Sequence, residues 1–299
     1  MSLGWQVYVL IITVATLVAH ILLLTWTSRI KIEQDQSAEN TTGHVWDGDL
    51  TEYNNPLPRW WLLLFHGTIV FGVIYLVLYP GSGVYGGILG WSQEDQYAEQ
   101  VTEAEARYGP IFEEYARQDI PTLAQNAEAM EAGFNLFGNN CAQCHGSDGR
   151  GATGFPNLTD DDWQWGGAPQ QILTSISNGR VAAMPGWQAA LGGPQQVENM
   201  AHYVLSLSGL DHDAAKAAEA QPKYGMFCAA CHGPQAKGNV ALGAPNLTDE
   251  AWVYEPTMDS LTTTIAEGRN GQMPAFEQTL GEDRVKVLAA YVYSMSSDQ

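Results

Sequence analysis

Two long stretches without a charged side chain stand out in the first third of the chain. They cover residues 5–26 and 60–79, and an aromatic residue marks both ends of each stretch. A helix rises about 1.5 Å per residue, so about 20 residues cross the roughly 30 Å hydrocarbon core of a bilayer. Aromatic side chains are enriched at both membrane surfaces. The pattern predicts transmembrane helices at about 4–28 and 60–80, which make residues 1–80 a membrane anchor.

The first stretch could also be a signal peptide that is cleaved off. No Lys or Arg precedes it, and the nearest basic residues, Arg29 and Lys31, follow it, so we expect it to be retained. Arg59 also lies between the two stretches, whereas the next basic residue beyond them is Arg107. Short loops with an excess of Lys and Arg stay in the cytoplasm. We therefore expect a cytoplasmic loop between the helices and both termini outside.

After the second stretch the chain changes from apolar to polar. Glycine and proline at residues 80–87 indicate a flexible exit from the membrane. Residues 92–130 carry spaced apolar residues among Glu, Gln and Arg, which is typical of surface helices. Pro110 and Pro121 should break this stretch. We expect residues 81–125 to form a periplasmic linker that is partly helical.

The rest of the chain contains one pattern twice. Cys-x-x-Cys-His occurs at residues 141–145 and at residues 228–232. A Met-Pro step follows each copy, 43 and 45 residues after its first cysteine, and the steps Pro-Asn-Leu-Thr-Asp, Gly-Arg and Tyr-Val also recur in the same order. Such self-similarity indicates a duplicated unit. We expect two consecutive domains, at residues 126–210 and 211–299.

The repeated pentapeptide is a haem c attachment motif. Its cysteines can each form a thioether to a haem vinyl group, and the histidine beside them can bind the iron. The residues assigned in this way are Cys141, Cys144, Cys228 and Cys231 for covalent attachment, with His145 and His232 as iron ligands. The four cysteines could instead hold zinc or form two disulfides. Neither has a use for the Met-Pro steps, so we expect two haem c groups.

The methionines of the Met-Pro steps are the expected ligands on the far side of each iron. A thioether is a soft ligand that suits this position and raises the potential. We expect Met184 to bind the iron held by His145, and Met273 to bind the iron held by His232. Other candidates stay open at this point: Met200, His202 and His212 for the first haem, Met258 and Met295 for the second. A histidine in this place would give a lower potential.

Prolines and arginines complete each copy. Pro156 and Pro245 resemble the proline of class I cytochromes c whose carbonyl accepts the imidazole N–H of the iron ligand, although an ordinary turn would look the same. Arg180 and Arg269 could pair with haem propionates, or be exposed arginines at a helix end. The expected fold is all-α, with two N-terminal transmembrane helices followed by two tandem class I cytochrome c domains.

Two histidines fall within the predicted membrane helices. His20 lies near the end of the first helix and His66 near the beginning of the second, so their depths in the bilayer could match. An ionisable residue inside a membrane is a functional candidate, and a haem b held between the two is one interpretation. A neutral imidazole that forms a hydrogen bond at a helix interface is the other.

Acidic residues dominate the charge. The chain has 33 acidic and 13 basic residues and a formal net charge of −20. Of these, 27 acidic and 10 basic residues follow residue 80. An acidic surface would attract a basic protein partner and speed its association at low salt, although net charge also serves solubility alone. The balance argues against binding of nucleic acid.

The segment from residue 44 to residue 80 adds a family resemblance. It reads His-Val-Trp-Asp-Gly-Asp-Leu-Thr-Glu-Tyr-Asn-Asn-Pro-Leu-Pro-Arg-Trp-Trp and continues into the second apolar stretch. This closely resembles the N-terminal signature of the dihaem subunit of cbb3-type cytochrome c oxidases, the CcoP or FixP family. The likeness extends over essentially the whole chain, including both haem motifs and both Met-Pro steps. Many members have a single membrane helix, so the additional first helix marks a variant.

The resemblance implies an electron-transfer subunit of a proton-pumping oxidase in aerobic or microaerobic respiration. Such a subunit sits in the bacterial inner membrane with its haem domains in the periplasm. It takes electrons from a soluble or membrane-anchored cytochrome c and passes them through two haems to the monohaem cytochrome subunit and the catalytic haem–copper subunit. Oxygen reduction itself is not expected on this chain, because iron with both a His and a Met ligand has no open position for oxygen.

Two other functions remain open from the sequence. In a haem-based gas sensor, oxygen, carbon monoxide or nitric oxide would displace the methionine. The chain offers no signalling domain, and two near-identical sites favour conduction. In a membrane-bound dihaem donor, the acceptor would be a different reductase or dehydrogenase. Co-purification with a copper-containing oxidase separates this last possibility from the oxidase subunit.

Overall fold

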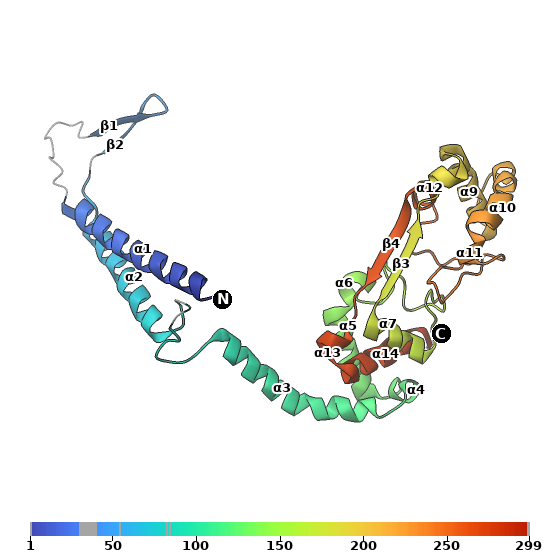
Figure 1. Ribbon diagram of the computed structural model, residues 1–299, viewed down its shortest axis with the longest axis horizontal. Coiled ribbons are helices and arrows are strands. Elements are labelled where there is room, and N and C mark those ends of the chain that lie inside the picture. The colour runs from blue at the N-terminus through green and yellow to red at the C-terminus, as the bar shows by residue number, and fades with distance from the viewer. Residues whose placement is uncertain (1, 30–40, 54, 82, 84, 298–299) are drawn as a thin grey trace. The chain divides into compact units, whose positions relative to one another are not determined.

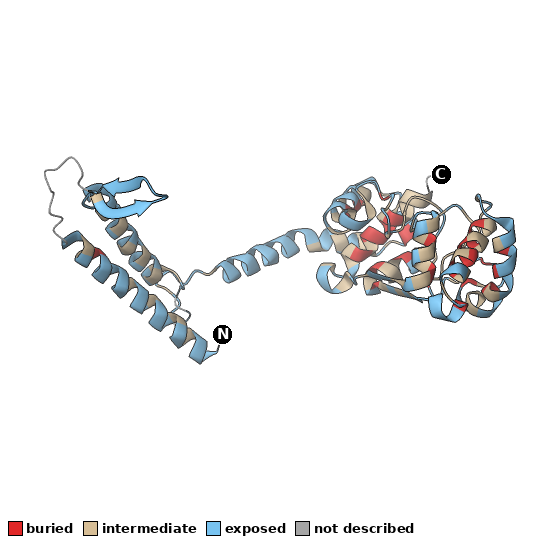
Figure 2. Ribbon diagram, turned by 90° about the horizontal axis from the view of Figure 1, so that it is seen from above, coloured by how far each residue is buried: buried red, intermediate tan, exposed pale blue. Residues whose placement is uncertain are grey.

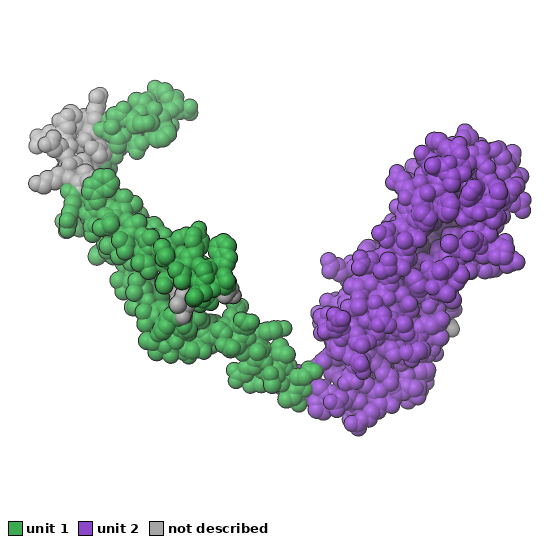
Figure 3. Space-filling model, in the orientation of Figure 1, with its two compact units in different colours: residues 1–106 green, residues 107–299 purple. Residues whose placement is uncertain are grey.

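The structure is a computed structural model that describes residues 2–29, 41–53, 55–81, 83 and 85–297. It divides into two compact units, residues 1–106 and 107–299 (Figure 3). The buried residues gather almost entirely in the second unit (Figure 2). The first unit carries the apolar stretches, and the second carries both haem motifs.

Two long helices confirm the apolar elements of the first unit. Helix α1 (Leu3–Arg29) and helix α2 (Arg59–Leu78) are both long and apolar enough to cross a membrane. A single residue of α1, Leu24, is buried, and α2 has no buried residue. Exposed apolar side chains all around a helix are costly in water and favourable in lipid. Both helices are therefore candidates for membrane spans.

A β-hairpin between the two helices corrects the expected all-α fold. Strands β1 (Thr41–Trp46) and β2 (Leu50–Tyr53) pair antiparallel. At their turn, Asp47 and Gly48 have positive φ angles of 54° and 90°. Asp-Gly is a strong hairpin signal, because Asp tolerates this region and Gly has no Cβ to clash there.

Helix α3 (Gln93–Ala116) differs from the expectation in its length. Pro110 lies inside it, where a break was predicted. A proline deprives the carbonyl four residues earlier, that of Ala106, of its partner. Ala106 is exposed, so water can replace the lost hydrogen bond. The prediction was correct for Pro121, which follows the N-cap Asp119 and begins the short helix α4 (Ile120–Leu123).

The second unit contains two lobes, each built on its own hydrophobic core. The first lobe contains α4, α5 (Ala127–Asn140), α6 (Ala142–His145), α7 (Pro169–Asn178), α13 (Glu277–Leu280) and α14 (Glu282–Ser297). The second lobe contains α8 (Gln188–Leu191), α9 (Pro194–Leu207), α10 (Ala214–Phe227), α11 (Ala229–His232) and α12 (Met258–Glu267). Figure 1 shows the two groups of helices joined by a pair of strands.

The lobes are not the two consecutive segments that the repeat suggested. The last helix of the chain, α14, packs on α5, α7 and α4, whereas α9 packs on α10 and α12. Each copy of the repeat has therefore exchanged its C-terminal helix with the other, and the expected boundary at residue 210 falls inside the second lobe. The helix pairing is equivalent in both lobes. Phe137 of α5 lies 5.6 Å from Tyr291 of α14 between ring centroids, and Tyr224 of α10 lies 5.3 Å from Tyr203 of α9.

The exchange passes through a two-stranded ribbon. Strand β3 (Arg180–Pro185) leads from α7 to α8, and strand β4 (Gly268–Met273) leads from α12 to α13. The two strands pair antiparallel along their full length (Figure 1). Beyond the ribbon, the Trp187 N–H donates to the Ile265 carbonyl in the second lobe, and the Phe276 N–H donates to the Ile176 carbonyl in the first. These hydrogen bonds attach the segment after β3 to the second lobe and the segment after β4 to the first lobe.

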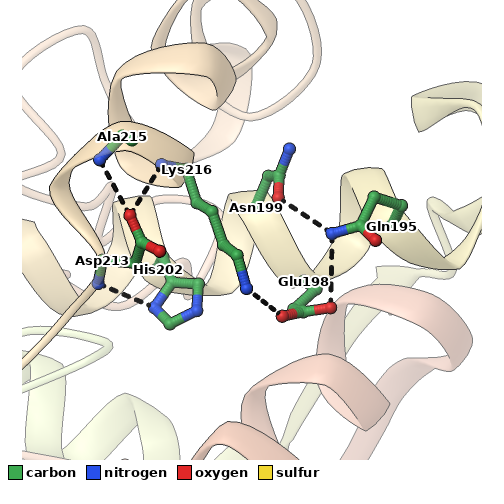
Figure 4. A network of polar contacts seen from close by, with 7 residues as sticks. All are labelled: Gln195, Glu198, Asn199, His202, Asp213, Ala215 and Lys216. Atoms are coloured by element: carbon green, nitrogen blue, oxygen red, sulfur yellow. Dashed lines mark hydrogen bonds and ion pairs between the residues drawn. The ribbon is translucent and has the colours of Figure 1, made fainter.

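Polar contacts hold α9 against α10 (Figure 4). Lys216 Nζ donates to Glu198 Oε1 at 2.5 Å, and the backbone N–H of Asp213 donates to His202 Nδ1 at 3.2 Å. The Asp213 carboxylate accepts the backbone N–H groups of Ala215 and Lys216 and so caps α10. His202, one of the open candidates for an iron ligand, thus takes part in the contact between these two helices.

The cap at Asp213 predicts a pH dependence. Hydrogen bonds from the backbone, that of Lys216 foremost, lower the pKa of Asp213. Its folded-state pKa lies below its unfolded value, so the carboxylate stabilises the fold above the unfolded value, and this contribution is lost as pH falls through the folded value. Asn also caps helices. We expect Asp213→Asn to show a smaller drop of the thermal midpoint between about pH 5 and pH 2 than the wild type. Equal drops would contradict this role of Asp213.

Candidate functional site

Each haem motif follows directly on the end of a long helix. Cys141 is the C-cap of α5, and Cys228 is the C-cap of α10. The rest of each motif forms one short helical turn, α6 or α11, which ends at the histidine. The first cysteine of each motif is half-buried and the second is exposed. The turn therefore holds two sulfurs and one imidazole close together in each lobe.

Both histidines are held in the orientation that an iron ligand needs. The Nδ1–H of His145 donates to the Pro156 carbonyl, and that of His232 donates to the Pro245 carbonyl, each at 3.0 Å. The other ring nitrogen, Nε2, keeps its lone pair for a metal. Burial lowers the pKa of both imidazoles, and the bond to the proline carbonyl opposes this in part. A lowered pKa favours the neutral form that binds metals.

The loops after the histidines approach their own backbone closely. Gly151 has a φ of +76°, and a Cβ on it would lie 2.5 Å from the Phe155 carbonyl oxygen. Gly238 has a φ of +80°, and a Cβ on it would lie 2.6 Å from the Ala244 carbonyl oxygen. Only glycine fits both the conformation and the space. These contacts bring Pro156 and Pro245 within hydrogen-bonding distance of the histidines.

Arg180 and Arg269 stand in equivalent surroundings. The Nε–H of Arg180 donates to Ser175 Oγ at 2.9 Å, and that of Arg269 donates to Thr264 Oγ1 at 2.8 Å. Each guanidinium also lies over an aromatic ring, that of Trp165 at 4.8 Å and that of Tyr254 at 4.1 Å. Within the described part of the chain, no carboxylate forms an ion pair with either arginine. Two half-buried cations without an anion fit the propionates of a haem.

The aromatic partners of these arginines were not anticipated from the sequence. Trp165 lies nine residues after Pro156 of the first copy, and Tyr254 lies nine residues after Pro245 of the second. Their equal distance from matching steps was a usable signal. The signal is weak because the two residues are of different types.

The ribbon determines where the two methionines lie. At one end of the ribbon, Arg180 lies opposite Met273. At the other end, Met184 lies opposite Arg269. Residues opposite each other, and residues an even number apart on one strand, share a face of the sheet. All four side chains therefore lie on one face, with the two pairs about 13 Å apart.

The two ends of the ribbon belong to different lobes. Met273 packs against the core of the first lobe, together with Cys141. Met184 lies three residues before Trp187, which packs against the core of the second lobe, as does Cys228. The sequence interpretation joined Met184 to His145 and Met273 to His232. The packing instead brings Met273 to the lobe of His145.

The other candidate methionines lie in the same two lobes as the haem motifs. Met200 is buried in the second core with 1% of its surface exposed, and Met258 packs against the same core. His212 Nδ1 lies 2.7 Å from the Leu210 carbonyl. Met295 is in the first lobe, beside Gly149.

In the first unit, the Nδ1 atoms of His20 and His66 each lie 2.7 Å from a carbonyl of their own helix. These contacts do not test the haem b interpretation.

Two family models match the chain. The N-terminal domain of cytochrome oxidase-cbb3, FixP, matches residues 38–86. Cytochrome C oxidase, cbb3-type, subunit III matches twice, at residues 128–204 and 215–292, which together exceed half of the chain. This chain belongs to the CcoP/FixP family. The two matches of the second model coincide with the two copies of the repeat.

Curated members of the CcoP/FixP family agree along nearly the whole length. The CcoP subunit of Rubrivivax gelatinosus is 46% identical over 293 residues, which are 98% of this chain and 95% of that protein. The FixP subunit of Sinorhizobium medicae is 37% identical, over 88% of this chain and 96% of that protein. The CcoP subunit of Cereibacter sphaeroides is 36% identical, over 87% and 95%.

Membership of the CcoP/FixP family identifies the general function of the chain. The chain is an electron-transfer subunit of a cbb3-type cytochrome c oxidase, an oxidoreductase complex. Its cytochrome c-type domains imply binding of haem c, and the apolar helices fit association with a membrane. The residues of both copies fit that cofactor, because each offers two sulfurs, an imidazole oriented by a hydrogen bond and an arginine over an aromatic ring.

Proposed function

We propose that this chain holds two haem c groups and relays electrons between a cytochrome c donor and the other subunits of the oxidase. The observation that carries the proposal is the pair of oriented imidazoles, each one turn from two cysteines. When bound, each haem would supply a reversible one-electron change of its iron. The residues around it would attach it through sulfur, hold its imidazole neutral and neutralise its propionates.

We further propose that the methionine ligands are exchanged between the copies. In this arrangement His145 and Met273 serve the haem at Cys141 and Cys144, while His232 and Met184 serve the haem at Cys228 and Cys231. The support is that Met273 packs in the same core as Cys141, and that the chain after Met184 enters the core containing Cys228. The pairing given by sequence order would require each methionine to turn away from the lobe that its own strand enters.

The ribbon also supports electron exchange between the two sites. Its two methionine–arginine pairs lie on one face about 13 Å apart. An iron held by a histidine and a methionine in both oxidation states would reorganise little on electron transfer, as a relay needs. With His145 and Met273 at one site and His232 and Met184 at the other, neither site would offer an open position to oxygen.

The proposed partners and location follow from the family and from charge. The partners are the monohaem cytochrome subunit and the catalytic haem–copper subunit, with a soluble or membrane-anchored cytochrome c as the donor. Arg29, Lys31 and Arg59 lie between the two apolar helices, which favours a cytoplasmic loop there. Both termini and both lobes would then face the periplasm of a bacterial inner membrane.

Electron transfer in the assembled oxidase tests this function. Replacing Cys228 and Cys231 with alanine should halve the haem stain of the denatured chain and abolish oxygen consumption driven by cytochrome c. Oxygen consumption driven by a small reductant that reduces the catalytic subunit directly should persist. Wild-type rates with cytochrome c in this variant would contradict a relay through both sites. A carbon monoxide complex of the reduced wild-type chain would favour gas sensing instead.

A further inference from the structure

The first four turns of helix α3 are exposed to solvent. Every residue from 93 to 108 is exposed. The end of the same helix is fixed, because Phe112 and Tyr115 pack against the core of the first lobe and Lys286 Nζ donates to the Ala116 carbonyl at 2.6 Å. Isolated helices of this length are marginal in water, and most gain their stability from packing of an apolar face.

An apolar stripe runs along this exposed part and ends just beyond it. It consists of Tyr97, Val101, Ala104, Tyr108 and Ile111. The steps between them are four, three, four and three residues, the spacing of a seam between two helices in a left-handed coiled coil. The large side chains are well exposed, with 68% of Tyr97 and 44–46% of Val101, Tyr108 and Ile111 accessible. The spacing therefore indicates a helix as the partner.

The charge of α3 limits what that partner can be. Arg107 is its one basic residue. Its acidic residues are Glu94, Asp95, Glu99, Glu103, Glu105, Glu113 and Glu114. A second copy of the helix would bring like charges together, and an anionic lipid surface would repel it in the same way. Both are disfavoured, and a basic partner is favoured.

The position and length of the stripe narrow the choice further. Only 14 residues separate the end of α2 at Leu78 from the beginning of α3 at Gln93, so α3 stays near the membrane. The stripe covers about two heptads, fewer than the three or four that sustain a coiled coil between free chains. A partner already held in the same membrane complex needs fewer heptads of contact, because tethering raises its effective concentration.

We propose that the apolar stripe of α3 is the docking surface for a basic amphipathic helix on a membrane-anchored partner subunit of the oxidase. This rests on the proposed function, because it assumes the assembled complex. The contact would fix the chain between its membrane anchor and its first lobe. Electrons could then leave from a defined position relative to the neighbouring subunit.

The first test removes the stripe without weakening the helix. Tyr97→Gln combined with Val101→Gln replaces two apolar side chains of the stripe by polar ones. Glutamine has a higher helix propensity than tyrosine or valine. Thr102→Gln combined with Ala106→Gln makes the matched change on the opposite face. After detergent solubilisation, the share of full-length chain bound to the haem–copper subunit should fall about tenfold in the stripe variant, with unchanged haem stain. The control variant should bind like the wild type.

The outcomes separate the two proposals. Wild-type binding by the stripe variant would overturn the docking proposal and leave the relay intact. Failure of the wild-type chain to bind any haem–copper subunit would overturn the proposed function itself. As an independent readout, a benzophenone attached at Val101→Cys should cross-link the chain to another subunit, at a peptide rich in Lys and Arg. Adducts between two copies of this chain, or with lipid alone, would overturn the proposal.

Discussion

Replacing Met273 with alanine is expected to remove the methionine ligand from the haem at Cys141, although the two residues lie in different copies of the repeat. The reason is the packing of Met273 in the core that contains Cys141. Loss of the thioether should lower the potential of that haem by on the order of 0.1 V or more, a part of the roughly 0.8 V over which axial ligands set haem potentials. The potential of the haem at Cys228 should stay nearly unchanged.

Single-haem chains make this measurement unambiguous. With Cys228 and Cys231 replaced by alanine, the full chain keeps one haem, and its optical and magnetic spectra report one set of ligands. In this background Met273→Ala should abolish the iron–sulfur signature, whereas Met184→Ala should leave it intact. With Cys141 and Cys144 replaced instead, the roles of the two methionines should reverse. The opposite result in both backgrounds would restore the pairing by sequence order.

Leu288→Ala is expected to destabilise the first lobe by about 2–5 kcal/mol, because a fully buried leucine leaves a cavity when it is truncated. Leu288 is completely inaccessible to solvent and belongs to α14, the last helix of the chain. It nevertheless packs in the core with Phe137 and Ile176 of the first copy. The change should therefore weaken a site whose cysteines lie more than 140 residues earlier in the sequence.

Hydrogen exchange of the intact holoprotein locates the effect. Leu288→Ala should speed exchange in peptides of α5 and leave α10 close to wild type. The matched variant Leu205→Ala, in α9, should do the reverse, because Leu205 belongs to the second core. Faster exchange in α10 on mutation of Leu288 would mean that the C-terminal helices are not exchanged in solution.

The sequence predicts those features that depend on neighbouring residues. Long apolar runs mark α1 and α2, and the haem motifs place Cys141, His145 and their counterparts without any knowledge of the fold. Pro156 and Pro245 accept the imidazole N–H bonds as expected. The hairpin at residues 41–53 was missed despite its Asp-Gly turn, and the helix through Pro110 was missed because solvent can satisfy a carbonyl that a proline leaves free.

The exchange of helices could not be read from the repeat itself. Both copies carry the same apolar positions, so the hydrophobic pattern of the sequence allows α5 to pack equally well on α9 or on α14. One signal did exist. Only residues 208–213 separate α9 from α10, and helices joined by so short a link usually pack on each other. That contact uses the face of α10 that a helix from its own copy would otherwise cover.

The exchanged helix also sets the order in which the two lobes can be completed as the chain is synthesised. The second lobe is contiguous, from the ribbon strand β3 to the ribbon strand β4, so it has all of its parts before the end of the chain arrives. The first lobe must wait for α14, which is synthesised after all the other described helices. The N-terminal lobe is thus the last to close, which leaves Cys141 and Cys144 accessible for the longest time.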